Sequence, residues 1–356
     1  MQAGTSTWAR LSGQLHVCRQ LAAWYKATNN INPVNGPWDE EGGWEQTSQR
    51  NCSQLLAASV LSNSQPPYCS WVGITCCSRA ESSAGRCSPV NAVAAIDLPL
   101  NNINASISDA SFMAPLLQLH DCGLAVANLE QNCFNGSISD DWGKMVNLRQ
   151  LTLANTWVTG TIPDSLRNLR NLTKINLSNT FLSGTLPPWL PELRQLSSVV
   201  LGQTTGLGGS FPAGMGLLQQ LQELNLEGTP LTGTLPADLC DLRGASKLLS
   251  LNIRRSGLSG NASALENCHN LVQLDISHNN FSGQLPASQH WGQLTMYHAN
   301  NNRFSGTLPR TLCDHAKLLR ALDISSNQIT GIIPSRIGMM LGLETLNWPT
   351  TSSQGL

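Results

Sequence analysis

Residues 172–187 read Leu172-Thr-Lys-Ile175-Asn-Leu177-Ser-Asn-Thr180-Phe-Leu182-Ser-Gly184-Thr-Leu186-Pro187. If Leu172 is numbered position 1, apolar residues occupy positions 1, 4, 6 and 11, glycine occupies position 13, an aliphatic residue position 15 and proline position 16. The same frame also starts at Val93, Leu124, Leu148, Leu196, Leu221, Leu248, Leu271, Leu294, Leu319 and Leu343. The first step is 31 residues long and the others are 23 to 27, so the pattern predicts stacked repeats.

Each position of the repeat has a physical reason. The alternation around positions 4 and 6 predicts a half-buried strand, and the glycine and proline redirect the chain. Position 9 is always Asn, Thr or Ser, whose side chains can satisfy backbone groups that become buried as the chain turns inward. Leu166 and Leu169, or Leu239 and Leu242, predict a short helical turn on the outer side. We therefore expect an α/β solenoid, with an inner parallel β-sheet and short outer helical or 3-10 turns.

The repeat resembles the plant-type leucine-rich repeat, which ends in Leu-x-Gly-x-Ile-Pro. The matching pairs are Ile162-Pro163, Leu186-Pro187, Leu235-Pro236, Leu285-Pro286, Leu308-Pro309 and Ile333-Pro334. The resemblance covers residues 93 to 348 and implies a right-handed horseshoe with a second short sheet around the Gly-x-Ile-Pro segment. Members of this family are ectodomains of receptor-like kinases and receptor-like proteins, and secreted inhibitors of cell-wall polygalacturonases.

Four regions follow from the frame. They are an unassigned tail at 1–14, a cysteine-containing N-terminal cap at 15–92, ten repeats at 93–342 and a truncated eleventh repeat at 343–356. Within the cap, Cys69-Ser-Trp71-Val-Gly73-Ile-Thr-Cys76 resembles the end of the plant-type cap. That resemblance implies a Cys69–Cys76 disulfide, and we expect Trp71 to be buried against the first repeat.

The eleven cysteines are read as structural disulfides, because they lack the short paired spacing of a zinc site. Cys77 and Cys87 bracket a loop that is absent from the short cap of the family, so we expect them to pair. Cys122 and Cys133 form a second expected pair. Cys18–Cys52 and Cys240–Cys268 are the remaining candidate pairs, which leaves Cys313 as the odd cysteine.

Disulfides indicate an oxidising compartment, so we expect an extracellular or cell-surface protein. The intracellular alternative stays open, because no signal peptide is visible at the start of the chain. The sequence stops inside a repeat, and we expect it to be incomplete there, with a membrane segment or kinase lost downstream. Candidate glycosylation sequons start at Asn51, Asn104, Asn135, Asn171, Asn176, Asn261 and Asn280.

Composition and motifs exclude several function classes. The net charge is -1, whereas a protein that neutralises nucleic-acid phosphates needs a basic excess. No run of 18 apolar residues predicts a membrane span. No hydrolase elbow, zinc-protease, phosphate-binding or dinucleotide-binding motif occurs. We expect neither enzymatic activity nor a cofactor.

Positions 2, 3, 5, 7 and 8 should project from the strands to form the ligand-binding concave face. The charged candidates are Arg149, Lys174, Glu223, Glu227, Arg254, Arg255, Asp275, His278, His298, Arg320 and Asp323. Glu227 and Arg254 share position 7, so they should be lateral neighbours about 4.8 Å apart. Position 5 should form the row Asn225, Asn252, Asp275, His298, Asp323 and Asn347, in which two carboxylates raise the pKa of the histidine.

The leading functional prediction is a non-catalytic module that recognises a protein or peptide, with a co-receptor or a secreted enzyme as further partner classes. A polygalacturonase inhibitor is the first alternative, although the mixed charge of the predicted face differs from the acidic face of those inhibitors. Ice binding is a second, because Thr and Ser recur beside the glycine of each repeat, but that series breaks at Gly208, Asn261 and Gln284. An intracellular repeat scaffold is the third alternative.

Overall fold

The computed structural model describes residues 74–77, 93–100, 103–120, 123–240 and 247–349, and predictions for the rest of the cap and the ends lie outside these residues. The chain divides into two compact units, Met1–Leu172 and Thr173–Leu356. Each unit is built from short parallel strands that recur once per repeat, as the frame predicts. The structure therefore confirms the α/β leucine-rich-repeat solenoid.

The described part of the first unit begins with an antiparallel pair and continues with parallel strands. Its strands are β1 (Ile74–Cys76), β2 (Val93–Asp97), β3 (Val126–Asn128), β4 (Asn135–Ser137), β5 (Gln150–Thr152) and β6 (Trp157–Thr161), and its helices are α4 (Ala110–His120) and the 3-10 turns η3 (Asp140–Lys144) and η4 (Asp164–Asn168). Strand β1 pairs antiparallel with β2, and β2, β3 and β5 follow in parallel. Strands β4 and β6 pair in a second, shorter sheet.

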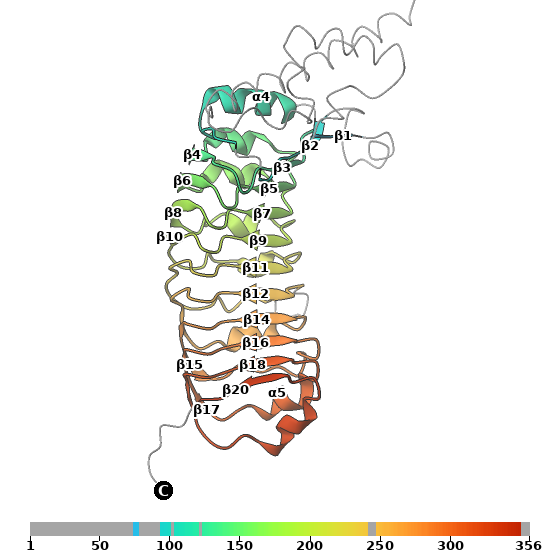
Figure 1. Cartoon of the computed structure of the whole chain (residues 1–356), viewed down its shortest axis with the longest axis vertical. Helices are drawn as coiled ribbons and strands as arrows, with labels where there is room; N and C mark the ends of the chain where they lie inside the picture. The colour runs from blue at the N-terminus through green and yellow to red at the C-terminus, as the bar shows by residue number, and fades with distance from the viewer. Residues whose placement is uncertain (1–73, 78–92, 101–102, 121–122, 241–246, 350–356) are drawn as a thin grey trace, which may run out of the picture. The chain divides into compact units, whose positions relative to one another are not determined.

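The second unit carries one sheet along its repeats and two shorter pairings beside it (Figure 1). The main sheet runs β7 (Lys174–Asn176), β9 (Ser198–Val200), β11 (Glu223–Asn225), β12 (Ser250–Asn252), β14 (Gln273–Asp275), β16 (Met296–His298), β18 (Ala321–Asp323) and β20 (Thr345–Asn347). The shorter sheets pair β8 (Phe181–Thr185) with β10 (Gly206–Gly208), and β13 (Ser259–Gly260) with β15 (Asn280–Gln284), β17 (Arg303–Gly306) and β19 (Gln328–Ile329). The helical segments are η5 (Leu190–Glu192), η6 (Met215–Leu217), η7 (Ser263–Asn267), α5 (Arg310–His315) and η8 (Ser335–Met339).

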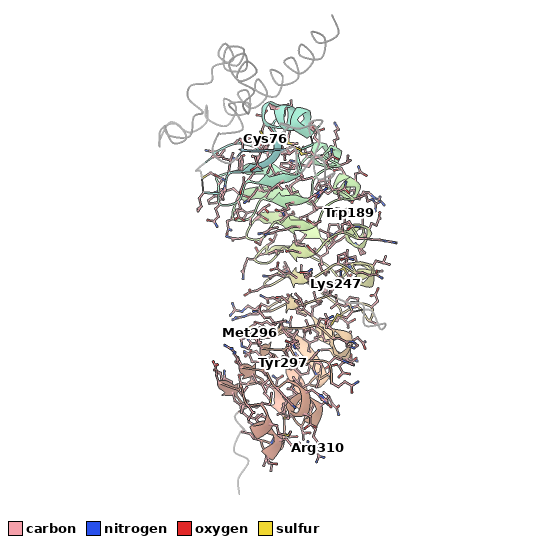
Figure 2. The ribbon with its side chains drawn as sticks, turned by 90° about the vertical axis from the view of Figure 1, so that its right-hand side faces the viewer. Cys76, Trp189, Lys247, Met296, Tyr297 and Arg310 are labelled. Atoms are coloured by element: carbon pink, nitrogen blue, oxygen red, sulfur yellow. A yellow bond between two sulfur atoms is a disulfide. The ribbon has the colours of Figure 1, made fainter. Side chains whose placement is uncertain are left out.

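The apolar positions of the frame form the core. In the repeat that starts at Leu271, the side chains of Leu271, Leu274, Ile276, Phe281 and Leu285 are all buried. The strand alternation is visible in β16 of the next repeat, where Tyr297 is buried and Met296, before it, is half-buried (Figure 2). Burial of the same positions in successive repeats makes one continuous apolar layer within the unit.

Position 9 supplies a ladder of buried hydrogen bonds, as predicted. The Oδ1 atom of Asn279 accepts hydrogen bonds from the backbone N–H groups of Ser256 and Leu258 in the preceding repeat, both at 3.1 Å. Its Nδ2 atom donates to the carbonyl oxygens of Ile253 at 2.8 Å and of Ile276 at 3.1 Å. Asn132, Asn302 and Asn327 make the same kinds of contact in their own repeats, and Thr156, Thr180 and Thr229 donate to a carbonyl three residues back.

Two positions of the repeat take a left-handed backbone. Glycine at position 13 has a positive φ in most repeats, and at Gly260, with φ +81°, a Cβ atom would lie 2.7 Å from Thr234 Cγ2. Position 8, three residues after the end of each main-sheet strand, also has a positive φ although it is seldom glycine. Its residues are Leu100, Gln131, Asn155, Asn179, Gln203, Gly228, Arg255, His278, Asn301 and Ser326. The left-handed turn directs most of these side chains to solvent.

The outer helical turns are confirmed, and one helix was not predicted. Leu166 is buried in η4, and Leu239 is also buried, whereas Leu242 lies outside the described residues. The unexpected helix is α4, which occupies the extra length of the first repeat. Phe112, inside it, packs edge-on against Phe134 with ring centroids 5.5 Å apart.

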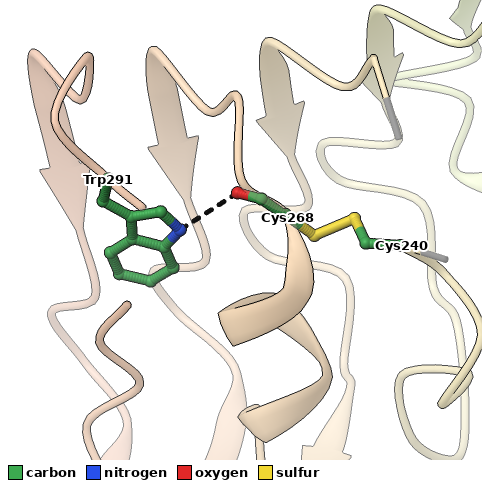
Figure 3. The surroundings of a disulfide bond; sticks show 3 residues. All are labelled: Cys240, Cys268 and Trp291. Carbon is green, nitrogen blue, oxygen red and sulfur yellow. Dashed lines mark hydrogen bonds between the residues drawn. A yellow bond between two sulfur atoms is a disulfide. The ribbon is translucent and has the colours of Figure 1, made fainter. Parts of the chain in front are cut away.

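The structure confirms one cysteine pair and corrects another. Cys240 and Cys268 form a disulfide between neighbouring repeats, and Trp291 Nε1 donates to Cys268 O at 3.1 Å (Figure 3). Cys313 is a buried free thiol, as predicted. The predicted Cys122–Cys133 pair is wrong, because Cys133 is an exposed free thiol that the local alternation turns to solvent between buried neighbours.

Cys76 and Cys77 are both disulfide-bonded. Their predicted partners, Cys69 and Cys87, lie outside the described residues, so those two pairings stay predictions. The Cys18–Cys52 pair and the buried position of Trp71 lie outside the described residues as well.

The ladder predicts that replacing Asn279 destabilises the protein far more than replacing Asn300. Asn279→Ala should lower the free energy of unfolding by roughly 3 kcal/mol, because several buried backbone groups lose their hydrogen-bond partner at a cost of about 1–3 kcal/mol each. Asn300→Ala, at a half-buried position, should cost about 0.5 kcal/mol. Urea unfolding followed by circular dichroism measures both, and equal midpoints for the two variants would refute a structural ladder.

Two of the described tryptophans, Trp142 and Trp291, are fully buried, and comparing them isolates the contribution of one hydrogen bond. Trp291→Phe should destabilise the protein by about 1 kcal/mol more than Trp142→Phe does, since both lose similar volume but only Trp291 donates its Nε1 proton. Trp142 Nε1 is buried and has no hydrogen-bond partner in the described structure. Thermal unfolding of the two variants tests this, and an equal loss would show that the bond to Cys268 contributes nothing.

Candidate ligand-binding face

The strand register brings the predicted position-5 residues into one row. Asn225 pairs with Asn252, Asn252 with Asp275, Asp275 with His298, His298 with Asp323, and Asp323 with Asn347. Every step of the predicted row is therefore confirmed. We call the exposed side of β11, β12, β14, β16 and β18, with the turn that follows each strand, the strand face.

The two aspartates of this row shape the backbone as well as carrying charge. Oδ1 of Asp275 accepts hydrogen bonds from Ser277 N at 3.0 Å and Ser277 Oγ at 2.6 Å. Asp323 makes the same pair of contacts with Ser325, at 3.0 and 2.7 Å. Such contacts to a residue two positions on are typical of Asp and Asn at turns. Asn128, Asn176, Asn225 and Asn252 likewise accept the N–H two residues on.

This turn contact was missed by the sequence analysis, although an Asp or Asn at position 5 followed two residues later by serine is a readable signal. The contact also explains why Asp275 is only 7% exposed, deeper than expected for a residue that should project to solvent. Asp275 is therefore a supporting residue of the strand face, with only part of its carboxylate available to a ligand.

His298 lies between the two carboxylates, and its charge depends on them. Its Nδ1 atom is 3.6 Å from Asp275 Oδ2, and this neighbour raises the pKa of His298 above the ordinary 6.5 in spite of partial burial. Burial by itself raises the pKa of Asp275, but the contacts with His298 and Ser277 outweigh it and keep that pKa below the ordinary value. The predicted direction of the histidine shift is thus confirmed.

Asp323 is held in the same way. Its burial raises its pKa, but hydrogen bonds from Ser325 and from Asn347 Nδ2, the latter 3.0 Å from Oδ2, lower it below the ordinary value overall. Both carboxylates of the row therefore favour the ionised form, and both already accept hydrogen bonds from the protein.

The acidic residues beside the arginines are also engaged. Glu227 Oε2 accepts a hydrogen bond from Asn252 Nδ2 at 3.1 Å, and Glu223 Oε2 accepts one from Ser198 Oγ at 2.7 Å. The backbones of the Glu227 and Arg254 repeats are adjacent, since Gly228 N donates to Arg254 O at 2.8 Å. Among the described residues, no ion pair joins the side chains of Glu227 and Arg254.

The two arginines are not neutralised by an ion pair within the described residues. The Nε atom of Arg254 is buried and has no hydrogen-bond partner within the described part of the chain. Arg255 takes the left-handed position, with φ +53°, and its side chain is exposed. Partial burial and the nearby charges of Arg254 and Arg255 lower the pKa of His278, so the three groups form one cluster in which the imidazole favours its neutral form.

The other predicted face residues lie around this cluster or in the first unit. Lys174 begins β7 and is half-buried, and Arg320 is exposed directly before β18. Arg149 is exposed before β5, in the first unit. None of these three belongs to the cluster of Arg254, Arg255 and His278.

The sequons differ in exposure. Asn135, Asn171, Asn261 and Asn280 are exposed and Asn104 is half-buried, whereas Asn51 lies outside the described residues. Asn176 is half-buried, and its Oδ1 atom accepts hydrogen bonds from Ser178 N and from Ser178 Oγ, the hydroxyl of its own sequon. Asn261 makes the same two contacts with Ser263 of its own sequon. Glycosylation stays a prediction.

The described residues contain neither a cluster of metal-ligating side chains nor a membrane-spanning helix. No group of three or more His, Cys, Asp or Glu side chains is arranged to hold a metal ion there. None of the described helices has the length and apolar character needed to cross a membrane.

Comparison with known proteins gave one family match and several similar structures. The leucine-rich repeat region family matches residues 102–355. The ectodomain of the Arabidopsis receptor kinase HAESA, solved with an IDA peptide hormone, is 29% identical with a TM-score of 0.67, over 82% of this chain and 46% of that one. The PEPR1–AtPEP1 structure is 26% identical with a TM-score of 0.67, over 82% and 38%.

A plant ice-binding protein is 18% identical with a TM-score of 0.56, over 95% of this chain and 98% of that one, and it shows the shared fold alone. A search of curated proteins found no match. The chain spans less than half the length of both receptor structures. The family match covers well over half of the chain, and the chain therefore belongs to the leucine-rich repeat family.

Proposed function

We propose that this chain is a non-catalytic recognition module that binds a peptide or protein ligand on its strand face, with Arg254 and Arg255 at the centre. The observation that carries the proposal is the state of the charges on that face. The carboxylates of Glu223, Glu227 and Asp323 already accept hydrogen bonds from the protein, whereas no ion pair within the described residues neutralises Arg254 or Arg255, and the side chain of Arg255 is exposed.

Such an arrangement favours an acidic group on the ligand. An arginine can hold a carboxylate with two parallel hydrogen bonds, and arginine is enriched among the residues that dominate binding energy at interfaces. His278 stands on the next repeat and His298 on the repeat after that, and each adds positive charge when it is protonated at low pH. The similarity to receptor ectodomains solved with peptide ligands supports a peptide as the ligand class.

The same similarity and the Cys240–Cys268 disulfide support an extracellular or cell-surface location. We also propose, as in the HAESA structure solved with the co-receptor SERK1, that a co-receptor is a partner class for this chain. Reduced cysteines would be expected for the intracellular scaffold, so the disulfide disfavours that alternative.

Ice binding receives less support than peptide recognition. Some of the hydroxyls beside the glycines are used by the protein, since Thr159, Ser259 and Thr330 donate to carbonyl oxygens of neighbouring repeats at 3.1 to 3.3 Å. In the second unit, only isolated bridges at Gly209–Leu231 and Thr234–Ser259 lie between β10 and β13. A flat, continuous hydroxyl lattice is therefore missing from these described strands. The mixed charge of the strand face likewise gives no support to an inhibitor that acts through an acidic face.

A matched set of arginine variants tests the ligand position. Peptides selected from a random display library against the wild-type protein should lose roughly tenfold or more in affinity for Arg254→Ala/Arg255→Ala, as a hot-spot pair does. Arg303→Ala/Arg310→Ala removes two exposed arginines from β17 and the start of α5 and should change the affinity less than about twofold. If the control pair weakens binding and the strand-face pair does not, the proposed position of the ligand is wrong.

The affinity should also follow the charge of His298. Because the pKa of His298 is raised above 6.5, the imidazole gains its proton as the pH falls through that raised value. An acidic peptide should therefore bind about two- to fivefold more tightly near pH 5.5 than near pH 8, an effect typical of a partly exposed charge. Isothermal titration calorimetry at several pH values measures this, and His298→Gln should flatten the profile.

Protein stability gives a ligand-free check of the same charge. A histidine whose pKa is raised in the folded state stabilises the fold fully at pH values below its unfolded-state pKa. That contribution is lost as the pH rises through the folded-state pKa. The stability difference between wild type and His298→Gln should thus be largest in acid and fade above neutral pH. A difference that grows with pH would contradict the His298–Asp275 interaction.

A further inference from the structure

Two histidines on neighbouring repeats are in ring contact away from the strand face. The ring centroids of His269 and His290 are 3.8 Å apart, with planes inclined by 33°. His269 lies between η7 and β14, and His290 lies between β15 and β16. His269 is half-buried and His290 is exposed, so solvent reaches the pair. The proposed recognition function makes no use of them.

The backbone under each histidine is fixed by buried neighbours. Cys268, directly before His269, is fully buried and bonded to Cys240. Trp291, directly after His290, is fully buried and donates its Nε1 proton to Cys268 O at 3.1 Å (Figure 3). The disulfide and the tryptophan therefore fix the backbone beside each histidine through contacts in which the imidazoles take no part.

We propose that His269 and His290 form a binding site for a divalent transition metal ion of the class that prefers imidazole, such as Zn²⁺. Imidazole nitrogens bind Zn²⁺ at about 2.0–2.1 Å, so two of them on one ion lie roughly 3 Å apart. Rings already in contact can reach that spacing by rotation of their side chains, without movement of the fixed backbone.

The chemistry of the surroundings fits a two-histidine site completed by water. Gln289 Nε2 lies 3.2 Å from His290 Nε2, so its amide can move aside or turn its oxygen toward a coordinated water. Because the described residues contain no group of three or more metal-ligating His, Cys, Asp or Glu side chains, water would fill the remaining positions. A thiolate or carboxylate set would select other ions, whereas imidazole alone suits zinc, nickel and copper.

Calorimetric titration with Zn²⁺ at about pH 7.5 tests the site, since unperturbed imidazoles are mostly neutral there. Zn²⁺ is chosen because it has no redox chemistry with thiols, and every sample carries Cys133→Ser, which removes an exposed competing thiol. We expect about one equivalent to bind to this parent protein. The affinity should fall roughly tenfold or more in both His269→Ala and His290→Ala.

His315→Ala and His278→Ala are the controls, because they remove imidazoles at the end of α5 and on the strand face. Both should bind Zn²⁺ like the parent. Unchanged binding in His290→Ala, or an equal loss in His315→Ala, would overturn the proposal. Thermal unfolding without metal shows whether each variant is folded, and His290→Gln replaces any alanine variant that is not. Peptide affinity is a separate measurement, so failure of this site leaves the proposed recognition function untouched.

Discussion

The fold depends on how each repeat satisfies the backbone groups that it buries when the chain turns inward. A strand of three residues has few hydrogen bonds of its own, and the turn after it sits over the apolar core where water cannot help. Side chains at position 9 take over that role, and each asparagine reaches both its own turn and the repeat before it. Because these contacts cross between repeats, a repeat is complete only when its neighbour is in place.

Features set by residues close together in the sequence and repeated along the chain could be predicted, whereas features that occur once could not. The apolar spacing is local and recurs many times, so it predicted the strands, the position-5 row through His298 and the polar ladder. Helix α4 was missed because the extra residues of the first repeat occur only once in the chain. Cys133 was misassigned because closeness in sequence to Cys122 says nothing about the direction of its side chain.

The sequence predicted which residues lie on the strand face but not which hydrogen bonds their side chains make. Sequence placed Glu227 beside Arg254, and the backbone register agrees, yet the carboxylate bonds to Asn252 instead. A choice between two nearby partners depends on side-chain reach and burial, which a one-dimensional pattern does not contain. The same applies to Asp275, whose sequence position suggested a ligand contact and whose hydrogen bonds give it a structural role.

The left-handed residue in the turn after each strand affects which substitutions such a protein can accept. An L-residue other than glycine is held there at a cost of about 1–2 kcal/mol, while its side chain points away from the layers that hold the repeats together. This position can therefore carry a different side chain in each repeat, here including Gln, Asn, Arg, His and Ser, without disturbing the packing between repeats. Glycine would relieve the backbone strain, but it would leave no side chain to contact a ligand. In every repeat, one residue therefore sets the stability of the turn against the presence of a side chain that a ligand could contact.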